Sequence, residues 1–172
     1  EGKSFTSMNL ALSMAMEKDI TVLLADADLA KPHISRSFGV ENEPGLVDAL
    51  QDATQDIESL VIPTDIDGLS ILPAGRHVDT ATELLGSKRM QQVVGRLAQA
   101  DSRRIVIFDS PPLLLTSESR ILTEIVGQVL LVVHSGRTPR KAVLDALASV
   151  AGNKHVSLVL NQTDATGQEE YY

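Results

Sequence analysis

Residues 104–112 read RIVIFDSPP, an apolar run that ends in an aspartate and is followed by a serine and two prolines. A run of this length with so few polar residues is typical of a strand that is buried on both faces. Four further runs share this character: TVLLAD at 21–26, LSILPAG at 69–75, QVLLVVHS at 128–135 and HVSLVLN at 155–161. Strands of this kind favour a parallel sheet that is covered by helices on each side.

Helical patterns alternate with these runs. We expect helices over residues 5–17, about 87–99, 117–125 and 139–150, the last with Pro139 where a first turn tolerates proline. The alternation predicts a doubly wound α/β fold with a mainly parallel sheet. We also expect a first strand, and the front half of a phosphate-binding loop, just before Glu1, because residues 2–4 read GKS and open a helix.

Composition limits the class of protein. The chain has 172 residues, of which 43% are hydrophobic, which predicts one domain over residues 1–161 and a tail without regular structure over 162–172. The net charge of −8 disfavours nucleic acid and anionic membranes as general partners. The absence of cysteine excludes disulfides and thiolate chemistry and fits a cytoplasmic location. No apolar run reaches the roughly 18 residues that a membrane span needs.

Polar side chains follow three of the predicted strands. Asp26 and Asp28 end the run VLLADAD, Asp109 ends IVIFD, and Asn161 ends SLVLN. Ligands of such sheets bind beyond the carboxyl ends of the strands, and a helix that begins at Gly2 would face the same edge. We therefore expect these side chains to lie close together.

The residue types at this edge suit a nucleotide with Mg²⁺. The helix amides and Lys3 would contact phosphate oxygens, the Ser4 hydroxyl would bind Mg²⁺, and a strand-end aspartate would hold the metal's water shell. Each feature also has an ordinary explanation, since GKS can open any helix and aspartates often cap helices or form turns. Together, however, they favour one nucleotide site.

The motifs, taken in order, resemble those of one family. EGKSFTSMNLALSMA, VLLADADLAKPHISRSFGV, PGLVDAL, LSILPAGR, TELLGSKRM, IVIFDSPPLL and LVLN look like the bacterial tyrosine kinases that autophosphorylate and control exopolysaccharide export. The resemblance is greatest to the autokinases associated with exosortase systems, and it covers essentially the whole chain. It implies a P-loop fold of the MinD/ParA type.

The resemblance also implies roles for single residues. ATP would contact Gly2, Lys3, Ser4 and Phe5 at the remaining part of the Walker A loop, and Asn161 at the adenine base. The metal ligands would be Ser4, Asp26 and Asp109. The catalytic residues would be Lys3, Asp26, Asp28 and Asp109, and the division of work between Asp26 and Asp28 stays open. One departure is Ala30, where family members often carry an arginine; its role either passes to Lys31 or is absent from this chain.

The two tyrosines of the chain are its last residues, Tyr171 and Tyr172, and they follow Glu169 and Glu170. By resemblance they begin the phosphoacceptor cluster, which is donated to the active site of a neighbouring molecule. The family further implies a homo-oligomer and a membrane-spanning activator of the chain-length-determinant type, fused or separate, that holds the kinase at the inner face of the cell membrane.

Two other functions fit the same fold. One is an ATPase switch of the MinD/ParA type, and the other is a non-catalytic module whose assembly depends on nucleotide. The paired aspartates Asp26 and Asp28 and the tyrosine end favour the kinase. ADP formation without phosphotyrosine would indicate the switch, and binding without turnover would indicate the module.

Overall fold

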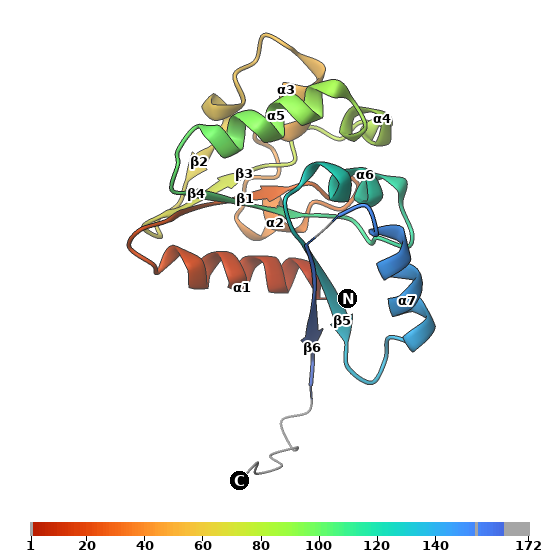
Figure 1. Cartoon of the computed structure of the whole chain (residues 1–172). Coiled ribbons are helices and arrows are strands. Elements are labelled where there is room, and N and C mark those ends of the chain that lie inside the picture. The colour runs from red at the N-terminus through yellow and green to blue at the C-terminus, as the bar shows by residue number, and fades with distance from the viewer. Residues whose placement is uncertain (1, 154, 164–172) are drawn as a thin grey trace.

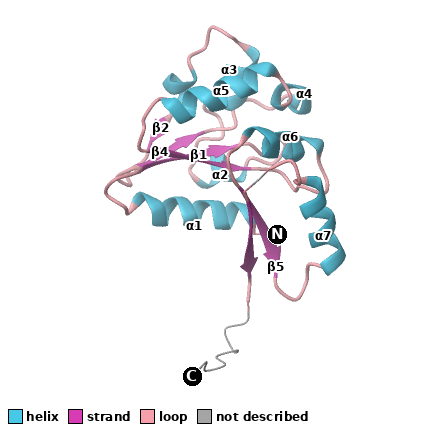
Figure 2. Ribbon diagram, viewed as in Figure 1, coloured by secondary structure: helices cyan, strands magenta, loops and turns pink. Residues whose placement is uncertain are grey.

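The computed structural model describes residues 2–153 and 155–163 and shows the expected alternation of helices and strands (Figures 1 and 2). The helices are α1 (Lys3–Ala15), α2 (His33–Ser37), α3 (Leu46–Gln51), the 3-10 helix η1 (Ile57–Leu60), α4 (Ala81–Leu85), α5 (Lys88–Gln99), α6 (Ser117–Ile125) and α7 (Arg140–Ser149). The strands are β1 (Thr21–Asp26), β2 (Ile62–Pro63), β3 (Leu69–Leu72), β4 (Arg104–Asp109), β5 (Val129–His134) and β6 (Val156–Asn161).

The larger sheet has the strand order β2-β3-β1-β4, and β1 runs parallel to both of its neighbours. The short edge strand β2 pairs antiparallel with β3. β5 and β6 form a separate parallel pair. The expected α/β fold with a mainly parallel sheet is confirmed, with the difference that the strands form two sheets within the described residues.

The core lies on both faces of β1, as the apolar run predicts. Leu23 and Ala25 pack into the cluster formed with α3, α4 and α5. Val22 and Leu24, which alternate with them, pack against α1 and α2. Figure 1 shows α3 and α5 on one side of the larger sheet and α1 on the other. Successive side chains of a strand point to opposite faces, so a strand between two helical layers must be apolar at every position.

A cavity of about 310 Å³ separates the two sheets. Its walls are α1, α6 and the facing strands β4 and β5, and they include Leu10, Ile107, Leu122 and Val129. Lys3 at the start of α1 lines the same cavity. The expected strand before Glu1 stays a prediction.

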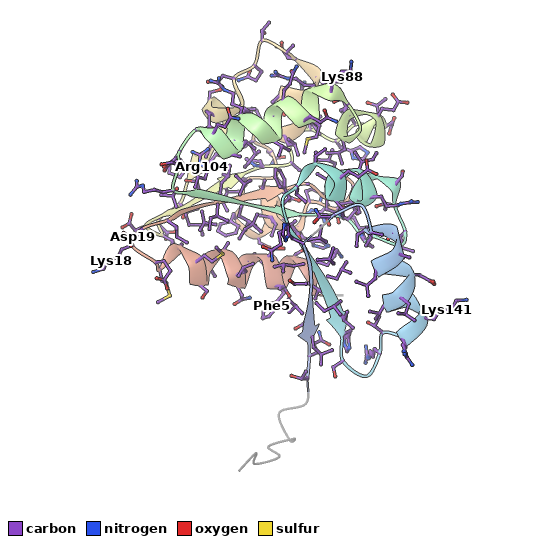
Figure 3. The ribbon with its side chains drawn as sticks, viewed as in Figure 1. Phe5, Lys18, Asp19, Lys88, Arg104 and Lys141 are labelled. Atoms are coloured by element: carbon purple, nitrogen blue, oxygen red, sulfur yellow. The ribbon has the colours of Figure 1, made fainter. Side chains whose placement is uncertain are left out.

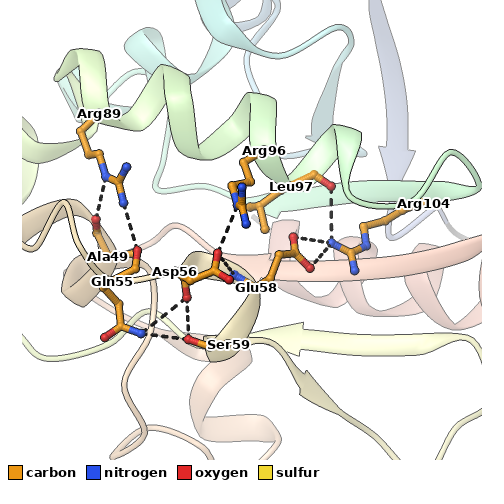
Figure 4. Close-up of polar contacts among 9 residues, drawn as sticks. All are labelled: Ala49, Gln55, Asp56, Glu58, Ser59, Arg89, Arg96, Leu97 and Arg104. Atoms are coloured by element: carbon orange, nitrogen blue, oxygen red, sulfur yellow. Dashed lines mark hydrogen bonds and ion pairs between the residues drawn. The ribbon is translucent and has the colours of Figure 1, made fainter.

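Hydrogen bonds and ion pairs from three arginines connect the segment around η1 to α5 and to the start of β4 (Figure 4). Arg104 Nη1 donates to Glu58 Oε1 at 2.7 Å and to Oε2 at 2.9 Å. Arg96 Nε donates to Asp56 Oδ1 at 3.1 Å, and Arg89 donates to the carbonyls of Ala49 and Gln55. Because Arg104 opens β4, this network lies at the amino end of the strand, away from Asp109. Within the described residues no helix has the length and apolar character to cross a membrane.

Candidate active site

Three aspartates meet at the carboxyl edge of the larger sheet. Asp26 ends β1, Asp109 ends β4, and the two residues are paired in the register of these strands. Asp28 follows two residues after β1. All three side chains are buried, with exposed fractions of 0% for Asp26, 6% for Asp28 and 1% for Asp109. The structure therefore brings together the carboxylates that the sequence analysis selected.

Asp109 is bound to the first turns of α1. Ser4 Oγ donates to Asp109 Oδ2 at 2.5 Å, and Ser7 Oγ donates to Oδ1 at 3.1 Å. The two serines are three residues apart, so they lie on one face of the helix. Ser4 was predicted and Ser7 was not, although its spacing from Ser4 is a usable signal. These bonds join the GKS helix to the strand that ends in Asp109.

Asp26 is held by α2 and, through it, by the end of β3. The backbone N–H and the hydroxyl of Ser35 both donate to Asp26 Oδ2 at 2.8 Å. The Ser35 hydroxyl in turn accepts the N–H of Ala74 at 3.0 Å. The other oxygen, Asp26 Oδ1, accepts the Asp28 N–H at 3.3 Å. Oδ1 is thus the oxygen with the longer contact and the greater capacity for a further partner.

Burial changes the protonation of both strand-end carboxyls. It raises the pKa of Asp26 to about 6, against the opposing hydrogen bonds from Ser35. It also raises the pKa of Asp109, although the Ser4 and Ser7 hydroxyls and the Lys3 ammonium oppose the shift. A carboxyl with a pKa near 6 is ionised at neutral pH yet binds a proton far more readily than an exposed aspartate does.

The N-terminus of α1 has the geometry of an anion site. Gly2 is the N-cap residue with φ of 92°, a conformation that glycine adopts without strain. A Cβ at this position would lie 2.0 Å from Nδ2 of Asn161, so the Asn161 amide packs against the Gly2 backbone. The Lys3 side chain lines the cavity beside this turn. The predicted phosphate-binding residues and the predicted adenine-binding asparagine therefore lie together.

Asn161 reaches this place from the second sheet. It ends β6, is paired in register with His134 at the end of β5, and accepts the Ser135 N–H at 2.9 Å. Phe5, also predicted to contact ATP, is 61% exposed near the start of α1 (Figure 3). Tyr171 and Tyr172 lie outside the described residues.

The donors near Asp109 fit Mg²⁺ better than a transition metal. Within the described part of the chain, no three side chains of His, Cys, Asp or Glu converge as a metal site. Mg²⁺ does not need such a cage, since it keeps several waters and takes one or two protein oxygens with substrate phosphates. The Ser4 hydroxyl and the Asp109 carboxylate, 2.5 Å apart, provide two such oxygens.

Comparison with known proteins agrees with this site. The sequence matches the family model described as AAA domain over residues 1–142. It is 32% identical over 173 residues to the tyrosine-protein kinase YwqD of Bacillus subtilis (strain 168), covering 99% of this chain and 71% of that protein. It is 31% identical over 140 residues to the tyrosine-protein kinase ptk of Acinetobacter johnsonii, covering 81% of this chain and only 19% of that much longer protein.

Solved structures give the same answer. The kinase domain of VpsO superposes with a TM-score of 0.85 at 33% identity, over 95% of this chain and 80% of that chain. The septum site-determining protein MinD of Pyrococcus horikoshii OT3 superposes with a TM-score of 0.72 at 20% identity, over 92% of this chain and 64% of that chain, which is a likeness of fold alone. The association with exosortase systems stays a prediction. By sequence, fold and site, the chain belongs to the family of bacterial tyrosine-protein kinases.

Proposed function

We propose that the protein transfers the γ-phosphoryl group of ATP to tyrosine hydroxyls, first of all to its own C-terminal Tyr171 and Tyr172. The observation that carries this proposal is the bond between Ser4 of the GKS helix and Asp109, beside the paired strand end Asp26. This arrangement supports the proposal because it brings the GKS helix, a serine hydroxyl bonded to a carboxylate, and a carboxyl of raised pKa to one edge of the sheet.

The chain's own groups hold the nucleotide. The amides at the N-terminus of α1 and the Lys3 ammonium bind the β- and γ-phosphates, because a helix N-terminus carries a partial positive charge. The Asn161 amide, which packs on Gly2, orients the base. Mg²⁺ would be held by Ser4 and Asp109, with Asp26 toward its water shell, and when bound it neutralises charge on the phosphate oxygens.

A tyrosine hydroxyl with a reference pKa of about 10 attacks poorly while it is protonated. Asp26 Oδ1 is the atom best suited to accept this proton, because Ser35 already gives two hydrogen bonds to Oδ2. Asp26 would also serve the metal's water shell, and Asp28 would assist from the turn after β1. In phosphoryl transfer the protein's main contributions are to align the attacking oxygen with the γ-phosphate and to stabilise the negative charge of the transition state.

Lys3→Met and Asp26→Asn separate binding from chemistry in the full-length protein. Lys3→Met removes the point charge on the phosphates and should abolish nucleotide binding or turnover. Asp26→Asn keeps the side-chain shape, so nucleotide should still bind while autophosphorylation falls. Calorimetry with Mg-ATP and phosphotyrosine immunoblots measure the two effects. Undiminished phosphotyrosine in Asp26→Asn would remove this residue from the mechanism.

Transfer between molecules is the expected mode. A protein with an intact site and both tyrosines changed to phenylalanine is mixed with a Lys3→Met protein that keeps its tyrosines. Phosphotyrosine on the Lys3→Met partner supports transfer in trans. Its absence, together with self-labelling of the wild type at a rate independent of concentration, would mean that the tail serves its own site.

The cellular setting that goes with this activity is also a proposal. We expect a homo-oligomer at the inner face of the cell membrane, held there by a membrane-spanning activator of the chain-length-determinant type, with exopolysaccharide polymerisation and export as the process under control. The rival function is an ATPase switch. It is supported by fold alone, since this chain superposes on MinD with a TM-score of 0.72 at only 20% identity. ADP release without any phosphotyrosine would favour it.

A further inference from the structure

The segment after the catalytic aspartates differs in charge from the rest of the chain. The protein carries a net charge of −8, yet residues 29–40 contain Lys31 and Arg36 and no acidic residue. Both cations are exposed, and His33 lies between them. Among residues 2–153 and 155–163, neither cation takes part in an ion pair. An acidic protein thus keeps two uncompensated positive charges in one short segment.

Hydrogen bonds fix the backbone of Lys31, and that of Ser35 just before Arg36, beside the candidate catalytic carboxylates. The Lys31 N–H donates to Asp28 Oδ1 at 3.0 Å and to the Asp28 carbonyl at 3.1 Å. Arg36 directly follows Ser35, whose N–H and hydroxyl bind Asp26 Oδ2. Each cationic residue is therefore bonded to a candidate catalytic aspartate or adjacent to a residue that is.

A third cation, Arg76, follows the end of β3, and the Ala74 N–H two residues before it is bonded to Ser35. The Arg76 guanidinium is paired with Asp48 at 2.7 Å, so a nearby carboxylate already offsets its charge. The next acids along the chain after Arg36 are Glu41 and Glu43, which lie beyond the turn at Gly39. Lys31 and Arg36 are thus the cations available to an incoming anionic group.

The acidic residues before the acceptor tyrosines would be repelled by the negatively charged site, and Lys31 and Arg36 would reduce this repulsion. Tyr171 is preceded by Glu169 and Glu170, and the tyrosine must approach Asp26, Asp28, Asp109 and the phosphates of ATP. Two acidic residues directly before the acceptor would be repelled from such a site, and the repulsion grows as water is excluded. Cations at the rim of the site would offset it.

We propose that Lys31 and Arg36 form the acceptor-binding edge of the site and take the carboxylates of Glu169 and Glu170 from a second copy of this chain. The inference rests on the proposed tyrosine kinase function and names the feature by which that site selects its acceptor. The lysine and arginine recognise the charge that precedes the tyrosine. An acceptor tyrosine without acidic residues before it binds less well.

The test compares the binding of two fluorescein-labelled peptides to the full-length protein with Mg-ADP, read by fluorescence anisotropy. One peptide has the tail sequence GQEEYY, and the other has both glutamates changed to glutamine. Two exposed ion pairs should make the acidic peptide bind about 3- to 30-fold more tightly at low salt, and the difference should shrink as salt screens the charges.

The decisive variant is Lys31→Glu/Arg36→Glu. The matched control is Lys18→Glu/Arg103→Glu, which makes the same change in charge at the amino ends of β1 and β4, on the opposite edge of the sheet (Figure 3 labels Lys18). The first variant should lose or reverse the preference for the acidic peptide, and the control should keep most of it. The Kd for Mg-ATP is measured in both variants, and Lys31→Glu/Arg36→Glu should weaken it more than the control, because the new carboxylates lie at the nucleotide edge of the sheet.

Equal affinity of the wild type for both peptides would overturn the proposal, as would a preference that survives Lys31→Glu/Arg36→Glu. Because anisotropy needs no turnover, this outcome is distinct from failure of the kinase function. That failure would appear as the absence of phosphotyrosine on any substrate. In active protein, the same preference should appear in KM for the peptides, with KM for ATP unchanged between peptides.

Discussion

Asp26→Asn should make the protein more stable above pH 6, although it removes a candidate catalytic group. In the wild type the Asp26 carboxyl is fully buried, and burial raises its pKa from 3.8 to about 6. Between these two values the folded protein binds more protons than the unfolded chain. The free energy of unfolding therefore falls as pH rises from about 4 to 6, and it stays lower above this range.

The magnitude follows from the size of the shift. A difference of about two pKa units corresponds to about 3 kcal/mol. The buried, ionised Asp26 carboxylate lowers the free energy of unfolding by this amount at neutral pH. The asparagine oxygen can keep both bonds from Ser35, but its amide NH₂ then faces the Asp28 N–H, whose contact with Oδ1 is 3.3 Å in the wild type. Losing that weak bond leaves an expected gain of about 2 kcal/mol.

Urea unfolding of both proteins from pH 4 to pH 8 measures the effect. The two stabilities should be similar near pH 4, where folded wild-type Asp26 is protonated, and should separate progressively as pH rises from about 4 to 6. Asp65→Asn, at an exposed position, is the control and should show no such separation. A difference between Asp26→Asn and wild type that does not depend on pH would refute the argument from burial.

Three further changes test the geometry of the site and of the core. Ser35→Ala leaves the buried Ala74 N–H without its partner and should lower the free energy of unfolding by about 2–4 kcal/mol in urea, whereas Ser37→Ala, exposed on the same helix, should change it by less than about 0.5 kcal/mol. Gly2→Ala combines a φ of 92° with a Cβ 2.0 Å from the Asn161 amide, so calorimetry should show at least about tenfold weaker Mg-ATP binding without loss of the fold by circular dichroism. Leu97→Ala, at a position with no exposed surface, should lower the free energy of unfolding by about 2–5 kcal/mol, seen as a lower Tm.

The long elements could be predicted because their signal is local. The run that ends in Asp109 became β4, and the predicted helices at 5–17, 87–99, 117–125 and 139–150 lie within two residues of α1, α5, α6 and α7. The short helices α2, α3, η1 and α4 and the two-residue strand β2 were not predicted, because they are too short to show a hydrophobic period.

The site divides in the same way. Ser4, Asp26 and Asp109 could be selected because each stands at the start of a helix or at the end of a strand, where the topology fixes its place. Ser35 could not, because its role depends on bonds to residues 9 and 39 positions away in the chain. The raised pKa of Asp26 could not be predicted from the sequence either, because it results from burial of the carboxyl in the folded protein.

Ser35 connects the chemistry of the site to its choice of acceptor. Its two bonds to Asp26 Oδ2 oppose the effect of burial on the pKa of that carboxyl, and Oδ1 keeps only the longer contact with the Asp28 N–H. The same bonds fix the backbone of Ser35, and Arg36 is the next residue of the same helix. A change at Ser35 should therefore alter both proton transfer and peptide preference, whereas Lys31→Glu/Arg36→Glu should abolish the preference while the Ser35 hydrogen bonds to Asp26 stay in place. This difference separates the residue that positions the catalytic carboxylate from the residues that recognise the acceptor.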